Sequence, residues 1–155
     1  MKNREILFKG KRVDNNEWEI GYFCHNVEYN KSFIINDSES TEVHPDTVCQ
    51  FTGLLDKNGN KIFEGDVISV KEFHNKSFDF PFDEQDEIRS AFPLEEMKGL
   101  LTASYVSDVK FENGEYIVCC GKKDGFYDSP LCIYFGDQKY CSTIHVIEII
   151  KNIHD

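Results

Sequence analysis

The stretch that decides the fold runs from residue 53 to residue 70 and reads Gly-Leu-Leu-Asp-Lys-Asn-Gly-Asn-Lys-Ile-Phe-Glu-Gly-Asp-Val-Ile-Ser-Val. Within it, Asn58-Gly59 is the dipeptide that most readily accepts positive φ at both central positions of a tight turn. It predicts a β-hairpin between the short apolar segments on either side. Glu64-Gly65-Asp66 predicts a second turn, which leads into a strand over residues 67–72. The stretch therefore indicates a sheet built from hairpins.

The same signals extend outward along the chain. Residues 4–13 and 17–24 flank a polar turn, and Trp18, Ile20 and Tyr22 alternate with less apolar residues, which predicts a hairpin with one apolar face. Further strands are predicted at residues 31–36, 41–44, 48–53, 106–111, 115–120 and 144–153, with turns at 37–40, 45–47 and Asn113-Gly114.

A segment of different composition separates these strands. Residues 74–102 are acidic, and two short helices are predicted there, over 83–92 and over 93–101, with Pro93 at the favoured first helical position of the second. The fold class is therefore mainly β with a short helical acidic insertion at about 74–103. The turn-rich seam near Gly53 divides the chain into an N-terminal β subdomain, residues 1–53, and a second subdomain, residues 54–155.

Composition excludes several classes of partner. The chain has 155 residues, a formal net charge of -11 and 14% aromatic residues. The negative charge disfavours direct binding to nucleic acid, because sequence-independent binding depends on Lys and Arg. We find no apolar run long enough for a signal peptide or a membrane span, so we expect a cytoplasmic protein that does not bind membranes. The six cysteines include no C-x-x-C pair and are expected to be free, mostly buried thiols.

The motif search predicts no catalytic residue, no metal and no cofactor. Asp56, Asn58 and Asn60 follow the start of a calcium-loop pattern, which then lacks its required Gly and Glu. The close thiol and imidazole pairs, at Cys24-His25 and at Cys141 with His145, lack an orienting third group. The histidine spacings fit no common metal motif, and no phosphate-binding glycine loop is present.

Three blocks of sequence carry a family resemblance. Residues 4–22, 45–54 and 56–67 look like the successive signatures of YopX-like proteins of bacteriophages and prophages, and residues 106–118 and the carboxyl end add weaker matches. The resemblance implies a small β protein whose carboxyl part forms an SH3-type barrel, encoded on phage or prophage DNA and made in a bacterial cytoplasm. It implies no particular activity. Cys49 stands where the family often has Gly, and the acidic insertion is longer than the usual connection.

Folding alone can explain the shared blocks. Glycines stand at turn positions, and the apolar residues are expected to form core. That expected core comprises Trp18, Tyr22, Phe51, Ile62, Phe63 and Val67.

The leading hypothesis for function is a non-enzymatic accessory protein that acts through protein contacts, with itself as a homo-oligomer and with a phage or host protein. One alternative is an acidic decoy that imitates nucleic acid. The other is a small-ligand binder or enzyme with a cleft between the subdomains. The candidate ligand-binding residues for that cleft, near the seam, are Asp46, Gln50, Glu64 and Asp66.

Overall fold

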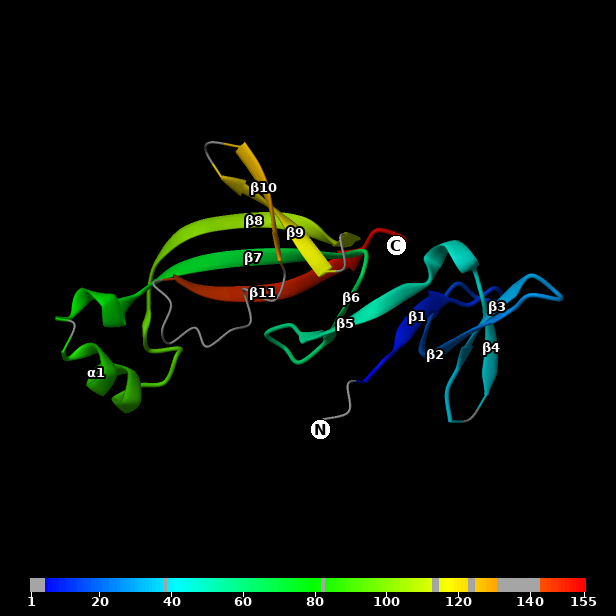
Figure 1. The fold of residues 1–155 in the computed structure, drawn as a ribbon, viewed down its shortest axis with the longest axis horizontal. Helices are drawn as coiled ribbons and strands as arrows, with labels where there is room; N and C mark the ends of the chain where they lie inside the picture. The colour runs from blue at the N-terminus through cyan, green and yellow to red at the C-terminus, as the bar shows by residue number, and fades with distance from the viewer. Residues whose placement is uncertain (1–4, 38, 82, 113–114, 123–124, 131–142) are drawn as a thin grey trace.

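The computed structural model of the chain describes residues 5–37, 39–81, 83–112, 115–122, 125–130 and 143–155. Side chains are described at these positions except 102, 118–122, 125–130 and 143. The strands form two antiparallel sheets that lie next to each other along the long axis of the molecule (Figure 1). The protein is therefore mainly β, as the sequence predicts.

The first sheet has the strand order β4-β3-β2-β1-β5-β6. Its strands are β1 (Phe8–Lys11), β2 (Trp18–Asn26), β3 (Lys31–Ile35), β4 (Ser40–Val43), β5 (Cys49–Leu55) and β6 (Lys61–Phe63). A short 3-10 helix, η1 (Pro45–Thr47), connects β4 to β5. The hairpin predicted around residues 14–16 and the strand pair around residues 37–40 are both confirmed.

The second sheet has the strand order β10-β9-β8-β7-β11. Its strands are β7 (Asp66–Asn75), β8 (Lys98–Glu112), β9 (Glu115–Lys122), β10 (Gly125–Pro130) and β11 (Thr143–Asn152). The strand predicted over residues 144–153 is confirmed as β11. Asn113-Gly114 lies outside the described residues, although β8 and β9 pair on either side of it.

The first sheet coils until β4 meets β1. Arg12 and Val43 form an antiparallel bridge, and the His44 N–H donates to the Lys11 carbonyl at 2.8 Å. Ile34 and Val43 are fully buried inside this small four-stranded curl. Gly21 permits the close approach of β2 to β3, because a Cβ at Gly21 would collide with the Ile35 carbonyl oxygen.

This curl reverses the face of β2 that we expected to be buried. Tyr22, expected in the core, is 61% exposed, and Ile20 is also exposed. The sheet curves toward the opposite face of β2, where Gly21 lies, so Ile20 and Tyr22 point outward, while Trp18 is half-buried. Phe51, Ile62 and Phe63 are buried as predicted.

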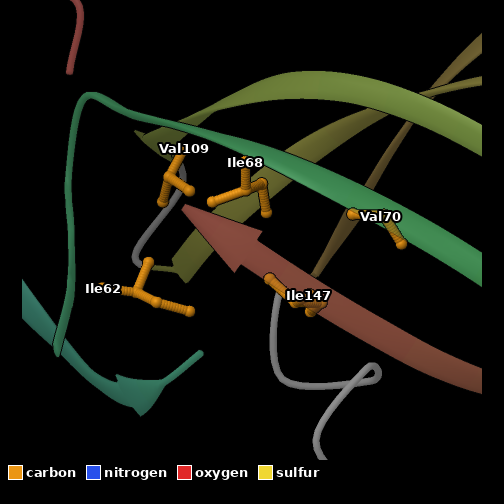
Figure 2. Packing of buried hydrophobic residues seen from close by; sticks show 5 residues of the cluster. All are labelled: Ile62, Ile68, Val70, Val109 and Ile147. Carbon is orange, nitrogen blue, oxygen red and sulfur yellow. The ribbon is translucent and has the colours of Figure 1, made fainter. Parts of the chain in front are cut away.

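The core of the second sheet includes a residue from the first sheet. Ile68 and Val70 of β7, Val109 of β8 and Ile147 of β11 form a buried cluster, and Ile62 of β6 packs into it (Figure 2). The β5–β6 hairpin therefore pairs with the first sheet through its backbone and packs on the second through this side chain. The division into subdomains at residue 53 stays a prediction.

The predicted hairpin at Asn58-Gly59 is confirmed, but its turn is of another type. Gly59 has a φ of +84°, whereas Asn58 is not among the residues with positive φ. The Gly59 N–H donates to the Asp56 carbonyl at 3.0 Å, and the Asp56 N–H donates to the Asn60 carbonyl at 2.8 Å. These bonds define a three-residue loop that ends on a left-handed glycine.

Between β7 and β8 the chain forms a projection that we call the arm, residues 76–97, at the end of the molecule opposite the first sheet (Figure 1). It contains a 3-10 helix, η2 (Lys76–Asp79), and one α-helix, α1 (Gln85–Ala91), which confirms the first predicted helix. The second predicted helix, over 93–101, is wrong. Residues 93–97 form turns and β8 begins at Lys98, because Lys98 pairs with Asn75 of β7. In the described ranges, no helix has the length and apolar character that crossing a membrane requires.

Candidate functional site

The four residues predicted near a cleft lie at different places. Asp66 is buried at the start of β7, Glu64 precedes it in the β6–β7 turn, and the Glu64 N–H donates to the Gln50 carbonyl of β5 at 2.9 Å. The fold therefore brings Gln50, Glu64 and Asp66 to one corner between the sheets. Asp46 is exposed in η1, and within the described part of the chain no hydrogen bond connects it to the other three.

Asp66 uses its carboxylate to tie the two sheets together. Its Oδ1 pairs with Lys9 Nζ of β1 at 2.5 Å and accepts from Asn152 Nδ2 of β11 at 2.9 Å. Its Oδ2 accepts from the Phe63 N–H at 2.8 Å. A buried carboxylate needs such compensation to offset its lost hydration. Asp66 is thus engaged in holding the structure.

The same corner continues into a set of contacts around Trp18. Lys9 Nζ lies 4.6 Å from the centre of the Trp18 ring, and Lys11 Nζ donates to the His154 carbonyl at 2.6 Å. Trp18 Nε1 donates to Asp155 Oδ1 at 2.9 Å. We call this set the joint; it comprises Lys9, Lys11, Trp18, Asp66, Asn152 and Asp155. The joint connects β1 and β2 to β7 and to the end of β11.

Two groups beside the joint have shifted pKa values. Burial raises the pKa of Glu64, which forms no ion pair within the ranges that the structure describes. Burial also raises the pKa of Cys49 to about 11. This thiol therefore stays protonated at neutral pH and is a poor nucleophile. Cys24, the other cysteine whose side chain the structure describes, is exposed. The side chains of the remaining four cysteines, Cys141 among them, are outside the described set, so the expectation of mostly buried thiols stays a prediction.

The residues that match the start of a calcium-loop pattern, Asp56, Asn58 and Asn60, form hydrogen bonds within the hairpin turn. Asp56 Oδ1 accepts from the N–H groups of Asn58 at 2.8 Å and Asn60 at 2.9 Å. Burial by itself would raise the pKa of Asp56, but the hydrogen bonds from Asn60 and Asn58 outweigh it and hold that pKa below its ordinary value. The Lys57 N–H also donates to the Ile147 carbonyl at 2.9 Å, which docks the turn on β11.

A cleft of about 560 Å³ lies between this turn, β11 and the end of the arm. Its volume suits a small molecule. Its lysines and its histidine already have acidic partners in the chain, however: Lys57 with Glu148 at 2.8 Å, Lys98 with Glu95 at 2.5 Å and His145 with Glu72 at 3.6 Å. Asp46, Gln50, Glu64 and Asp66 do not line this cleft.

A second and smaller hollow, of about 190 Å³, lies on the arm. We call it the arm groove; it is lined by Lys76, Ser77, Phe80, Ile88, Phe92, Glu96 and Met97. Met97 and Ser77 form a buried floor, whereas Phe80 is 41% and Phe92 is 45% exposed. Sequence reasoning missed this groove. The available signal in the sequence was a set of phenylalanines at 78, 80, 82 and 92 within an otherwise acidic segment.

Buried polar side chains hold the walls of the arm groove. Arg89 Nη2 donates to Gln85 Oε1 at 2.7 Å, and Arg89 Nε donates to Ser77 Oγ at 3.2 Å. Gln85 Nε2 donates to the Phe80 carbonyl at 3.0 Å, and Asn75 Oδ1 accepts from the Ser77 N–H at 3.0 Å. The groove is therefore a shaped feature of the folded arm.

Comparison with known proteins provides a single family match. The family described as YopX protein matches residues 4–155, which is nearly the whole chain. No curated protein and no solved structure gives a match. The matched region spans both sheets, the joint and the arm, and the chain belongs to the YopX family.

Proposed function

We propose that this YopX family protein is a phage-encoded, non-enzymatic accessory protein that acts by binding another protein through its arm. The observation that carries the proposal is the arm groove with its exposed aromatic side chains, Phe80 and Phe92. Aromatic side chains gathered at the surface mark interaction sites more often than scattered apolar residues do. The arm also projects from the end of the molecule, where a partner can reach it (Figure 1).

The chemistry of the other candidate residues supports a non-enzymatic role. Asp66 is engaged by Lys9 and Asn152, and Cys49 is held as the protonated thiol. The lysines that line the cleft along β11 form ion pairs with neighbours in the chain.

Self-association belongs to the same proposal. Ile20, Tyr22 and Ile35 lie on the outward face of the first sheet and are exposed. Tyr22 and Ile35 are directly opposite each other on β2 and β3. A second copy of the chain could cover this apolar face. Sedimentation velocity of the wild type and of Tyr22→Ser tests this part: we expect an oligomer that Tyr22→Ser weakens, and a wild type that stays monomeric at all concentrations overturns it.

The acidic decoy is a second candidate function. The seven carboxylates of the arm, against two cations, favour it. However, the arm carries these carboxylates beside exposed phenylalanines, which a phosphate mimic does not require. We therefore rank protein binding through the groove above nucleic-acid mimicry.

Site-specific crosslinking tests binding through the arm. A photoreactive phenylalanine analogue replaces Phe80 at the arm groove or, as a control, Tyr29, an exposed aromatic residue in the β2–β3 turn. After irradiation in bacterial cells, we expect a discrete heterologous adduct from position 80 and none from position 29. Equal adducts from both positions, or adducts from neither, would contradict a partner site on the arm.

A further inference from the structure

The size and rigidity of the arm groove limit what can occupy it. At about 190 Å³ it is smaller than the roughly 300–1,000 Å³ of small-molecule pockets. It therefore has room for one or two apolar side chains of a larger partner. Because Gln85 holds the Phe80 carbonyl and Arg89 holds Ser77 and Gln85, the groove needs little reordering on binding.

The charge around the groove selects the kind of partner. Residues 76–97 contain seven carboxylates and two cations, which gives the arm a net charge of -5. One of the two cations, Arg89, is buried and pairs with Asp86 at 3.2 Å. The other cation, Lys76, is part of the groove wall, where its Nζ donates to the Glu96 carbonyl at 3.2 Å. The arm as a whole remains acidic, with one cation at the groove.

Two exposed carboxylates lie at or near the apolar lining. Glu96 is itself part of the groove wall. Glu84 lies four residues before Ile88, and the Ile88 N–H donates to the Glu84 carbonyl at 3.1 Å, so both share one side of α1. Within the described ranges neither carboxylate forms an ion pair inside the chain. Both are available to cations on a partner.

Resting on the proposed function, we propose that the arm groove is a receptor for a basic protein segment that carries one bulky apolar side chain. The apolar side chain enters between Phe80, Ile88 and Phe92. The lysines or arginines beside it face Glu84 and Glu96. The apolar contact supplies affinity, and the opposite charges orient the segment and speed its association.

The same charges disfavour the other occupants. A second copy of the chain would bring one acidic arm against another, and nucleic acid would add phosphates to carboxylates. The most basic stretch of this chain, residues 9–12, is already engaged: Lys9 pairs with Asp66, Lys11 donates to His154, and Arg12 pairs with Asp14. A separate basic segment is therefore the occupant that fits.

Peptide binding to the full-length protein tests the proposal. The probe is a fluorescent synthetic peptide of Lys, Arg and Gly with one central Phe, measured by fluorescence anisotropy. Two comparison peptides replace the Phe by Ala, or every Lys and Arg by Glu. We expect the Phe-to-Ala change to weaken binding roughly 10- to 100-fold, as the loss of one buried aromatic side chain should. The Glu peptide should not bind, and added salt should weaken the basic peptide.

Protein variants locate the binding site. Ile88→Ser in the groove and Glu84→Lys at its edge should each weaken the basic peptide at least several-fold. Leu100→Ser, an exposed apolar residue outside the groove lining, and Glu28→Lys, an exposed acid in the β2–β3 turn, are the matched controls and should leave binding unchanged. Circular dichroism at the assay temperature must show each variant folded. Ile88 is partly buried, so Ile88→Ser can unfold the protein. Glu84 is exposed, so Glu84→Lys should stay folded and still tests the binding site in that case.

Three results would overturn the proposal: equal binding of the Phe and Ala peptides, binding of the Glu peptide, or equal effects of Glu84→Lys and Glu28→Lys. The outcome also separates the two proposals. A crosslink specific to position 80 without peptide binding refutes a basic partner and retains a protein partner on the arm. Loss of both the crosslink and the peptide binding refutes both.

Discussion

At the scale of single residues, Gly59 shows how backbone conformation constrains a family signature. Its φ of +84° is strained for any residue with a Cβ, although nothing lies within 4 Å of where that Cβ would be. The neighbouring Lys57 contributes an exposed ion pair with Glu148. Backbone conformation, rather than packing, therefore decides which amino acids can occupy position 59.

We predict that Gly59→Val lowers the free energy of unfolding by roughly 1–2 kcal/mol or more, because valine is branched and adds to the left-handed penalty. Lys57→Ala keeps the backbone bond to Ile147 and loses only an exposed pair, so it should cost roughly 1 kcal/mol or less. Urea unfolding of both variants measures the difference. A larger loss for Lys57→Ala would show that the side chain, and not the turn, secures the hairpin.

Glu64 offers a prediction with a defined pH dependence. Burial raises its pKa above the ordinary value of 4.5, so the folded state holds this proton more tightly than the unfolded state does. The resulting stabilisation is present below about pH 4 and is lost as the pH rises through the folded pKa. At neutral pH, a half-buried ionised Glu64 therefore costs stability.

Glu64→Gln should accordingly raise the melting temperature slightly at pH 7, and the difference from the wild type should shrink on acidification. Glu28→Gln, at an exposed position, is the control and should show no such trend. Thermal melts followed by circular dichroism at several pH values test this expectation. A less stable Glu64→Gln at pH 7 would mean that the carboxylate makes a favourable interaction, which would support its candidacy as a ligand-binding residue.

At the scale of elements, turn chemistry was the most predictable part of the fold. The hairpins around residues 14–16, 37–40 and 56–60 follow from local residues, because glycine, asparagine and aspartate act within a few positions. The second arm helix could not be predicted in this way. Residues 98–101 join β8 because β7 offers them a partner strand, and that pairing is not local.

Which face of a strand becomes buried was also hard to predict, because it depends on contacts between residues that are distant in sequence. The apolar alternation of Trp18, Ile20 and Tyr22 correctly indicates a strand, but the direction of curling decides which face becomes buried. That direction depends on Gly21 approaching β3, a contact between strands. The turns placed Gln50, Glu64 and Asp66 near one another, and their role in binding a ligand stays a prediction. The engagement of Asp66 by Lys9, distant in sequence, could not be predicted from local residues.

The boundaries of the arm give a prediction at this scale. Asn75 is fully buried at its base, and Phe73 pairs with Leu101, so residues 98–101 belong to the sheet. Replacing residues 76–97 by a short Gly/Ser turn should leave a folded protein, because a shorter loop closes with a small entropic saving. The replacement removes Met97 and Arg89 together with the groove they support.

Replacing residues 75–102 instead should destabilise the protein much more, since it also removes strand pairs of β7 and β8. Thermal melting of the two deletions compares them, and peptide binding should be lost in both. Equal stability of the two deletions would show that the outer part of the β7–β8 ladder contributes little to the fold.

At the scale of the whole molecule, the two sheets are connected at separate places. Ile62 of the first sheet packs in the core of the second (Figure 2). The 56–60 turn docks on β11, and the joint links β1 and β2 to Asp66 and Asp155. Each connection has one partner in residues 4–22 or 56–67, two of the blocks that carry the family resemblance. Residues that join the sheets therefore lie within the region that the family matches, as does the arm.

Because the joint connects the two sheets, we predict that they unfold together and that Lys9 is needed for this coupling. Trp18, the single tryptophan, reports on the first sheet, so its fluorescence and the far-ultraviolet circular dichroism should show coincident unfolding transitions. Lys9→Met leaves the Asp66 carboxylate buried without its cation and should cost about 3–5 kcal/mol. The double variant with Asp66→Asn removes that charge and should recover part of the loss. Separate transitions in the wild type, or a double variant no more stable than Lys9→Met, would show that the ion pair does not couple the sheets.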